Sequence, residues 1–260
     1  MKCKICGSET VLIFRTMIRR KYETSILRCS ECGYVFPENV HWLAEAYTSA
    51  INESDTGLLD RNRTFSNQLS TLLYFCFKEN DAFLDYAGGY GVFTRLMRDI
   101  GFNFYYYDPY CENIFAKGFD RKENTMGKFD LLTSFETFEH FENPLEELQK
   151  MFGLAGTIVF STVTIPEPVP SPDNWWYYGF QHGQHISFYT ETTFLKMAEL
   201  LHCRFYKYHG LFLFTKSNIS YSKISLLSLL SRFRFSIFVR ILKKSLTISD
   251  HKMLLNRHKE

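Results

Sequence analysis

Ala82-Phe-Leu-Asp-Tyr-Ala-Gly-Gly-Tyr-Gly91 is followed directly by Val92-Phe-Thr-Arg-Leu-Met97. The first part is an apolar run ending in an acid, which predicts a buried strand, and the second part has the apolar spacing of an amphipathic helix. The glycine-dense turn lets the backbone approach a ligand that a Cβ would repel, and the helix N-terminus favours negative charge. Strand, turn and helix predict an open α/β sheet, but the turn alone also fits a dinucleotide-binding enzyme.

More strand and helix patterns follow this turn. Asn103-Phe-Tyr-Tyr-Tyr-Asp108 is a strand pattern whose acid lies 17 residues beyond Gly91, where a carboxylate can accept hydrogen bonds from both ribose hydroxyls. Further strands are predicted at 128–136 and 156–161, with a closing antiparallel hairpin at 204–208 and 211–216. Asn143-Pro144 followed by acids predicts the start of a helix with an N-cap and a proline in its first position.

The order and spacing of these motifs resemble the class I S-adenosylmethionine (SAM)-dependent methyltransferases. The subgroup core reads D-x-G-G-G-x-G-x-F, then Y-D-P, then F-D-x-x-x-x-x-E-x-x-E-H, which here are Asp85–Phe93, Tyr107–Pro109 and Phe129–His140. The resemblance implies a Rossmann-like sheet with helices on both faces and SAM as cofactor. One departure is Ala87 at the family's first glycine position, and because a methyl group is small we expect cofactor binding to survive.

The resemblance also implies roles for single residues. The backbone from Ala87 to Gly91 would pack against the methionine moiety of SAM, with Asp85 organising contacts to its amino end. Asp108 would hold the ribose, Pro109 and Phe119 would flank adenine, and Glu136 would border the donor methyl. The alternative for Glu136 and Glu139 is that they are solvated acids at the start of a helix. The complete set implied for the cofactor is Asp85, Ala87, Gly88, Gly89, Gly91, Asp108, Pro109, Phe119 and Glu136, with one of Arg61, Asn62 and Arg63 reaching the cofactor carboxylate.

A histidine-containing loop is the candidate acceptor side. A hydroxyl acceptor has to lose a proton during methyl transfer, and histidine suits that task near neutral pH. The loop follows an aromatic, proline-rich stretch at 166–178, and the block from Trp175 to Tyr189 resembles a signature of zinc-ribbon members of the subgroup. We expect His185 to be the general base, with His182 and then His140 as the next candidates. Alternatively, His185 hydrogen-bonds the loop or caps the next helix, and the aromatics at 175–178 are packing rather than a sugar or base platform.

Four cysteines near the N-terminus form two C-x-x-C-G motifs. Cys3 and Cys6 precede one glycine, and Cys29 and Cys32 precede another. Two such turns place four sulfurs at the corners of a tetrahedron, which suits a structural Zn²⁺ with no open position. The segment 10–28 between them is expected to form a β-hairpin. A zinc ribbon at residues 1–38 is therefore predicted, and two unrelated pairs, one of them redox-active, are the less favoured alternative.

The rest of the chain divides into a methyltransferase domain at 39–218, with a helical lead-in at 39–80 and a core at 81–218, and a tail at 219–260. From Tyr221 onward there are nine Lys or Arg and only two acids, although the whole chain carries a net charge of +2. Apolar residues at helical spacing predict an amphipathic helix or helix pair, suited to an anionic membrane, a nucleic acid or a protein partner, or else a solvated face. These apolar residues are Ile224, Leu227, Leu230, Phe233, Ile237 and Ile241.

No signal peptide or run of about 18 apolar residues is visible, so we expect a cytoplasmic protein that could contact a membrane peripherally through the tail. Cys76, Cys111 and Cys203 are expected to be buried packing residues. The leading hypothesis is O-methylation of a sugar hydroxyl in a surface polysaccharide or a nucleotide-linked sugar. An RNA methyltransferase that binds through ribbon and tail, and a non-catalytic SAM-binding protein, are the alternatives.

Overall fold

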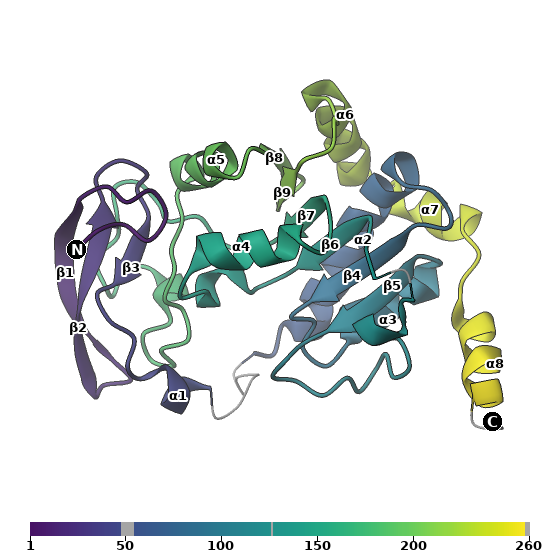
Figure 1. The fold of residues 1–260 in the computed structure, drawn as a ribbon, viewed down its shortest axis with the longest axis horizontal. Coiled ribbons are helices and arrows are strands. Elements are labelled where there is room, and N and C mark those ends of the chain that lie inside the picture. The colour runs from purple at the N-terminus through teal and green to yellow at the C-terminus, as the bar shows by residue number, and fades with distance from the viewer. Residues whose placement is uncertain (48–54, 126, 258–260) are drawn as a thin grey trace.

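The computed structural model describes residues 1–47, 55–125 and 127–257 of the chain (Figure 1). Two sheets organise these residues: one of three strands near the N-terminus and one of six strands in the middle of the molecule. In Figure 1 the smaller sheet lies at one end of the longest axis, and the last helix lies at the other end.

The N-terminal sheet contains β1 (Thr10–Ile18), β2 (Tyr22–Cys29) and β3 (Val35–Pro37). β1 and β2 pair antiparallel from Thr10–Cys29 to Ile18–Tyr22, which confirms the predicted hairpin. β3 adds to the other edge of β2, also antiparallel. The hairpin therefore brings the two cysteine pairs, which lie at its open end, close to each other.

Four strands of the central sheet run parallel: β4 (Ala82–Tyr86), β5 (Asn103–Tyr107), β6 (Leu131–Ser134) and β7 (Thr157–Phe160). β8 (Arg204–Tyr208) and β9 (Leu211–Thr215) form the predicted antiparallel hairpin, and β9 pairs antiparallel with β7. The order across the sheet is β5-β4-β6-β7-β9-β8. Because β4, β5 and β6 are parallel and adjacent, the segments that follow them emerge at one edge of the sheet, where a ligand site is expected.

Helices cover both faces of this sheet, as predicted for the α/β fold. α2 (Leu58–Cys76) and α3 (Val92–Ile100) pack on one face, where their buried Leu72 and Phe93 share a core with Phe83 of β4. α4 (Pro144–Phe152) and α5 (Glu191–Leu200) cover the other face, where Met151 and Phe194 share a second core. The sheet is thus buried on both sides, which explains its apolar strands.

The starts of α4 and α5 differ from one another. α4 begins at Pro144 as predicted, but the side chain of its N-cap residue Asn143 makes no capping hydrogen bond. α5 begins with a capping box in which the Thr190 side chain accepts from the Thr193 N–H. The alternative in which His185 caps α5 is therefore wrong, because Thr190 occupies that position.

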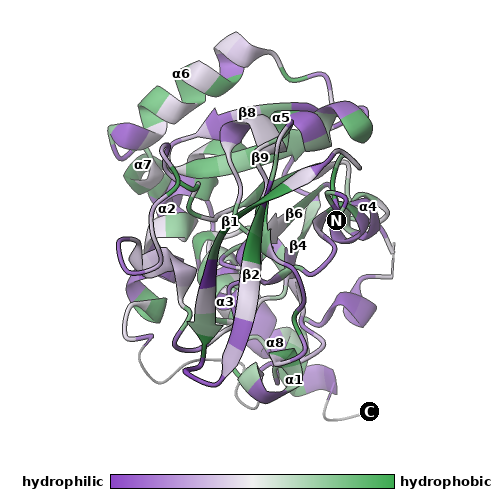
Figure 2. Cartoon of the chain, turned by 90° about the vertical axis from the view of Figure 1, so that its left-hand side faces the viewer, coloured by the Kyte–Doolittle hydropathy of each residue, from purple (hydrophilic) through white to green (hydrophobic). Residues whose placement is uncertain are grey.

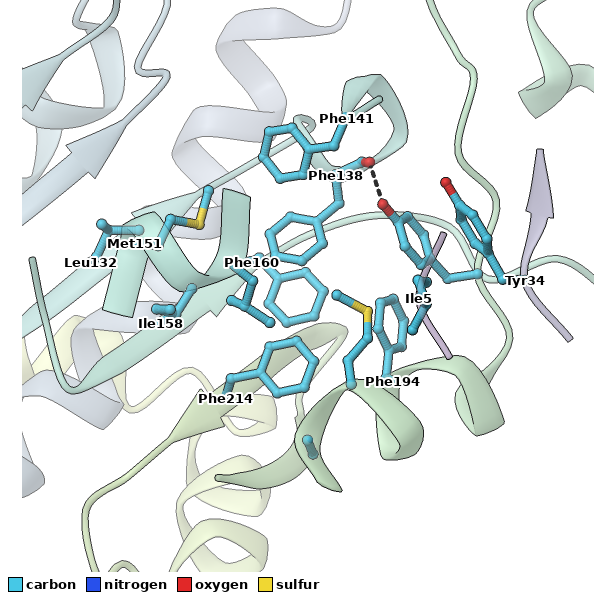
Figure 3. Close-up of a cluster of buried hydrophobic side chains, with 14 of the residues drawn as sticks. Ile5, Tyr34, Leu132, Phe138, Phe141, Met151, Ile158, Phe160, Phe194 and Phe214 are labelled. Carbon is cyan, nitrogen blue, oxygen red and sulfur yellow. Dashed lines mark hydrogen bonds between the residues drawn. The ribbon is translucent and has the colours of Figure 1, made fainter. Parts of the chain in front are cut away.

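The N-terminal sheet shares a core with the central domain. Figure 3 shows Ile5 and Tyr34 of the N-terminal region beside Phe138, Phe160 and Phe194, and all five belong to one buried cluster. The dashed line in Figure 3 is the hydrogen bond that the Tyr189 hydroxyl donates to the Phe138 carbonyl, at 2.7 Å. The hydrophobic core therefore continues across the predicted domain boundary at residue 38.

Short elements connect the larger ones. α1 (Leu43–Ala46) precedes α2, and the predicted polar break between these helices falls partly on 52–54, outside the described residues. The single-turn helices η1 (Arg121–Glu123), η2 (Phe138–His140) and η3 (Trp176–Tyr178) follow β5, β6 and β7, respectively. Within the described residues, every helix is too short or too polar to cross a bilayer.

The tail forms three helices, one more than the pattern predicted: α6 (Tyr221–Arg232), α7 (Ser236–Leu242) and α8 (Thr247–Arg257). Arg234, with φ +56°, separates α6 from α7. Hydrophobic and hydrophilic residues alternate along α6 in Figure 2. Ile224 and Leu227 are buried, whereas Phe233, Ile237 and Ile241 are exposed. The apolar residues of the pattern therefore do not form one continuous face: some pack into the core and others face solvent. Residues 258–260 lie outside the described residues.

Candidate functional site

The glycine-dense turn lies between β4 and α3 and faces the end of β5. The backbone N–H groups of Ala87 and Gly88 donate to the Tyr107 carbonyl, at 2.7 and 3.3 Å. Ala87 itself has φ +58°, a left-handed conformation that costs a residue with a Cβ about 1–2 kcal/mol. Gly88 cannot be replaced without movement, because a Cβ there would lie 2.6 Å from Asp85 Oδ2. The turn is therefore shaped tightly by backbone contacts.

Asp85 lies beneath this turn and is almost fully buried. Its two carboxylate oxygens accept hydrogen bonds from the hydroxyls of Thr94 (3.1 Å) and Thr133 (3.0 Å), which belong to α3 and β6. Burial raises the pKa of Asp85 to about 7, and the two hydroxyls oppose that shift. In this position Asp85 ties β4, α3 and β6 together under the turn.

Asp108 directly follows β5 and lies beside the turn. Its Oδ2 accepts the Gly89 N–H at 2.9 Å, and its Oδ1 accepts the N–H groups of Tyr110 and Cys111 at 2.8 and 2.9 Å. The structure therefore brings Asp108 and the glycine turn together, as a shared cofactor site requires. Because a carboxylate has about four lone-pair sites and these three N–H groups occupy three of them, Oδ2 can still accept from one ribose hydroxyl.

Pro109 and Phe119 have different surroundings. Pro109 is exposed next to Asp108. Phe119 is 3% exposed, and the Arg98 guanidinium carbon lies 3.6 Å from the centre of its ring. Arg98 in turn pairs with Asp250 of α8, at 2.8 Å. Phe119 is thus packed against an arginine that also binds the tail, and its contact with adenine stays a prediction.

Glu136 marks the end of β6. It has φ +52°, its backbone N–H donates to Ser161 Oγ at 2.8 Å, and its Oε1 accepts from the same hydroxyl at 2.6 Å. Arg61 Nε lies 3.8 Å from Glu136 Oε2, so one of the three candidate residues on α2 does reach this edge. Burial, with a smaller contribution from Glu139, raises the pKa of Glu136 to about 7. It is therefore not the fully solvated acid of the alternative interpretation.

His140 and His185 face each other at this edge, with ring centres 5.1 Å apart. His140 Nδ1 lies 3.0 Å from the Gln184 carbonyl, and His185 Nδ1 lies 2.6 Å from the Tyr177 carbonyl. Since a carbonyl only accepts, Nδ1 carries the hydrogen in both rings and Nε2 keeps its lone pair. Burial lowers the pKa of His140 to about 4 and that of His185 to about 3, so both rings are neutral at pH 7.

His182 has the opposite arrangement. Its Nδ1 accepts the Gln184 N–H at 3.1 Å, so the hydrogen lies on Nε2. Burial lowers the pKa of His182 to about 4. A neutral ring of this tautomer has no free lone pair, which makes His182 a weaker candidate base than His185 or His140.

Glu139 is the member of this site that the candidate list from the sequence omitted. It is 1% exposed and lies next to His140 on η2, and its carboxylate comes near both histidines. Its backbone carbonyl accepts from the N–H groups of Ile186 and Ser187, at 2.8 and 3.0 Å, which fastens the His185 loop to η2. Burial raises the pKa of Glu139 to about 7. Glu139 is the second acid of the E-x-x-E-H motif, but nothing in the sequence indicated its burial.

The aromatic segment before the loop is mostly packing. Trp175, Tyr177 and Tyr178 are buried, and only Trp176 among these four is exposed, at 79%. Tyr178 packs edge-on against Phe14 of β1, with ring centres 5.7 Å apart. Three of the four aromatics therefore cannot stack on a ligand in this conformation, and Trp176 is the one that can.

The N-terminal sheet holds the loop that carries His185. The Trp42 indole N–H donates to the Gly183 carbonyl at 2.8 Å, and the Arg19 N–H donates to the Phe180 carbonyl at 2.7 Å. Val35 and Phe188 exchange both backbone hydrogen bonds, each 2.9 Å long. The sheet is thus a scaffold for the acceptor side of the site.

The four N-terminal cysteines lie together, with their sulfurs all within 4.8 Å of one another. Cys3 and Cys32 sulfurs are 3.7 Å apart, and Cys6 and Cys29 sulfurs are 3.4 Å apart. The backbone N–H of Ile5 points at the Cys3 sulfur, and that of Cys32 points at the Cys29 sulfur. This is the arrangement of two cysteine turns that bind one metal ion. Four thiolates at this spacing fit Zn²⁺. Cys76, Cys111 and Cys203 are half-buried rather than fully buried.

The sheet order, the glycine turn and the acids at the carboxyl edge of the strands define a class I SAM-dependent methyltransferase fold. A methyltransferase domain family matches residues 59–203, which is more than half of the chain. The chain belongs to this methyltransferase family. No curated protein shows significant sequence similarity to it.

Several solved methyltransferase structures are similar to this chain at low sequence identity. The plantazolicin methyltransferase BpumL in complex with SAH is 13% identical, covers 74% of this chain and 87% of its own, and has a TM-score of 0.48. Magnesium protoporphyrin IX methyltransferase from Synechocystis PCC 6803 with bound SAH is 10% identical, over 68% of this chain and 94% of its own, with a TM-score of 0.45. An O-methyltransferase family 2 protein from Planctomyces limnophilus in complex with apigenin is 13% identical, covers 68% of this chain and 66% of its own, and has a TM-score of 0.43.

Proposed function

We propose that this protein transfers a methyl group from SAM to a hydroxyl of a saccharide, in a surface polysaccharide or a nucleotide-linked sugar. The observation that carries the proposal is a neutral imidazole, His185, held with a free Nε2 lone pair beside the edge where the glycine turn and Asp108 meet. A cofactor site and a proton acceptor at one sheet edge are what O-methylation requires. The exposed Trp176 supports a sugar acceptor, because indole rings stack on flat sugar faces.

The reaction is an in-line displacement at the donor methyl. SAM held beside the glycine turn and Asp108 would supply the methyl group as an electrophile, and its sulfur would leave with the electron pair of the broken carbon–sulfur bond. In this mechanism, the hydroxyl proton passes to His185 Nε2. His185 Nδ1 stays bonded to the Tyr177 carbonyl throughout, which fixes the ring while Nε2 takes the proton.

For the N-terminal sheet we propose a structural zinc ribbon, with Zn²⁺ held by Cys3, Cys6, Cys29 and Cys32. Four thiolates leave no open position for a substrate, so the ion would stabilise the fold without taking part in the reaction. The backbone hydrogen bonds of Arg19 and Val35 with Phe180 and Phe188 support a second role, which is to hold the acceptor side in place.

The tail is proposed to contact an anionic membrane surface. Phe233, Ile237, Phe238 and Ile241 are exposed apolar side chains on and around α7, with the exposed cation Arg234 among them. Basic side chains near an anionic surface contribute about 1 kcal/mol each. The chain should sediment with vesicles of anionic phospholipid and lose that association in Phe233→Ser/Phe238→Ser, while equal association with zwitterionic vesicles, or none with either, contradicts the proposal.

Calorimetric titration of SAM tests the cofactor assignment. Hydrogen bonds to a charged group contribute about 1.5–3 kcal/mol, so Asp108→Ala should weaken SAM binding by about 10- to 100-fold. Glu112→Ala, an exposed acid on the same loop, is the matched control and should bind SAM as the wild type does. Unchanged affinity in Asp108→Ala contradicts the assignment. RNA binding that falls steeply with salt, without glycan methylation, would instead favour a nucleic-acid acceptor.

A further inference from the structure

Three side chains from two separate segments bring metal-ligating atoms close to one another. Glu139 and His140 belong to η2, and His185 comes from the loop before α5. One carboxylate oxygen and one ring nitrogen from each histidine all lie within 4.8 Å of one another. This cluster shares no residue with the four cysteines.

The two histidines have the tautomer that a metal ligand needs. Each Nδ1–H is bonded to a backbone carbonyl, that of Gln184 for His140 and that of Tyr177 for His185. In metal sites the ligating histidine commonly donates its other N–H to a carbonyl or carboxylate, which fixes the ring and the tautomer. Both rings therefore present a fixed Nε2 lone pair without rearrangement.

The third atom is a buried oxygen without a partner. Glu139 is 1% exposed, and its Oε2 has no hydrogen-bond partner among the described residues. An unsatisfied buried acceptor costs about 1–3 kcal/mol and more when it is charged. A cation between this oxygen and the two imidazoles would give the oxygen a partner. The unpaired oxygen is therefore an observation for a metal site that is independent of the distances among the three residues.

We propose that Glu139, His140 and His185 bind a divalent transition-metal ion. Two imidazoles with one carboxylate favour ions such as Zn²⁺, Fe²⁺, Co²⁺ or Mn²⁺ over Mg²⁺ and Ca²⁺, which prefer all-oxygen ligands. Ligands around a tetrahedral ion at about 2.1 Å lie about 3.4 Å apart, so small side-chain rotations draw the three atoms together. Three protein ligands leave at least one position open, in contrast to the four-cysteine cluster.

His182 is excluded from this site by its tautomer. Its ring centre lies 4.8 Å from that of His185, but its Nδ1 accepts the Gln184 N–H and its Nε2 carries the hydrogen. It has no lone pair to offer an ion. His182 is therefore a matched control for the two proposed histidine ligands, from the same loop and with similar burial.

The role of the ion rests on the proposed function. At its open position the ion would bind the oxygen of the acceptor hydroxyl and lower the pKa of that hydroxyl. The proton would leave to solvent, after which the oxygen attacks the methyl carbon and the carbon–sulfur bond breaks toward sulfur. His185 would then act as a positioning ligand, and the same Nε2 lone pair would hold the ion instead of taking the proton.

Cobalt titration of the full-length protein tests the site. A brief treatment with a soluble chelator should strip the three-ligand site before the closed thiolate site, and Co²⁺ alone is then added. We expect visible d–d absorption without new sulfur-to-cobalt charge transfer, and one metal equivalent beyond that of the cysteine cluster by elemental analysis. Glu139→Gln, which keeps the side-chain shape, and His185→Ala should each lose this equivalent, whereas His182→Asn should retain it.

The possible outcomes separate this inference from the proposed function. No cobalt beyond the cysteine equivalent in the wild type, or an unchanged spectrum in a Glu139→Gln protein with wild-type circular dichroism, overturns the metal site. SAM affinity, measured by calorimetry on the same preparation without cobalt, is untouched by that failure. A protein that binds the second equivalent but methylates no acceptor would keep the metal site and contradict the proposed function.

Discussion

The cofactor side of the site is shaped by backbone hydrogen bonds within one short stretch, whereas the acceptor side joins segments that are far apart in the sequence. Gly89, Tyr110 and Cys111 all donate N–H groups to the single carboxylate of Asp108. On the acceptor side, the loop of His185 is held to η2 by the Glu139 carbonyl and to the N-terminal sheet by backbone hydrogen bonds between Val35 and Phe188. If the proposed function is right, the difference means that cofactor binding would be a local property of this chain, while acceptor chemistry would depend on the N-terminal sheet.

Loss of one ribbon cysteine should produce the largest difference between the effect on the cofactor side and the effect on the acceptor side. Cys29→Ser should lose the bound zinc and lower the Tm by on the order of 10 °C, since metal binding supplies folding free energy to so small a sheet. Methyl transfer should fall far more than SAM affinity, because the ribbon holds the acceptor loop and not the glycine turn. Elemental analysis, thermal denaturation and calorimetry measure the three effects.

The half-buried Cys203 provides the matched control for that variant, since Cys203→Ser lies outside the cluster and should keep its zinc and its Tm. Equal losses of SAM affinity and methyl transfer in Cys29→Ser would show that the two sides are not independent.

Replacement of His185 should affect turnover and leave the cofactor side intact. Loss of a proton acceptor or of a ligand that activates the acceptor typically lowers kcat by about 10²–10⁴. We therefore expect His185→Ala to bind SAM with wild-type affinity and to lose kcat in that range. His251→Ala, on the exposed surface of α8, is the control. Full activity of His185→Ala would remove this residue from the reaction.

The difference in the pH dependence of stability between the wild type and Asp85→Asn should report on the cofactor side alone. Burial raises the pKa of Asp85 to about 7, so the folded protein keeps a proton that the unfolded chain has already released. The resulting stability is complete below pH of about 4 and is lost as the pH rises to about 7. Between these values, the free energy of unfolding of the wild type should fall by on the order of 3 kcal/mol more than that of Asp85→Asn.

Urea denaturation across this pH range measures the difference, and the other titrating groups cancel because both proteins contain them. Parallel curves for the wild type and Asp85→Asn would mean that Asp85 is ionised in the folded protein.

The smallest expected effect concerns Ala87. Ala87→Gly relieves a left-handed conformation that costs about 1–2 kcal/mol, but it also frees the unfolded backbone by about 0.5–1 kcal/mol. The net change should be a gain in stability of less than about 1 kcal/mol, with SAM affinity preserved. Ala198→Gly, inside α5, should destabilise by about 1 kcal/mol and serves as the contrast. A comparable loss in Ala87→Gly would contradict the strain at this turn.

The cofactor side could be predicted from the sequence because its elements are contiguous. The strand, the turn and α3 follow each other within 82–100, and Asp108 ends the next strand. Periodicity and glycine placement report such local order directly. What could not be predicted is that Asp85 lies under the turn with two threonine partners, because Thr133 comes from a strand much later in the chain.

The acceptor side could be predicted only in part. His185, His182 and His140 were expected near the site, but their tautomers depend on carbonyls and N–H groups of the folded loop. The burial of Trp175, Tyr177 and Tyr178 against the ribbon arises from tertiary packing, which an aromatic-rich pattern does not specify. The third tail helix was missed because α8 is anchored by Asp250 between Arg95 and Arg98, not by apolar periodicity.

Transfer of a labelled methyl group from SAM tests the central claim most directly. The purified protein is incubated with labelled SAM and fractionated cell extract, and label is counted in glycan, nucleotide-sugar, RNA and protein fractions. The account predicts label in the glycan or nucleotide-sugar fraction with the wild type and with His251→Ala, and none with His185→Ala or Asp108→Ala. Label in RNA or protein alone, or equal labelling by His185→Ala, would contradict it.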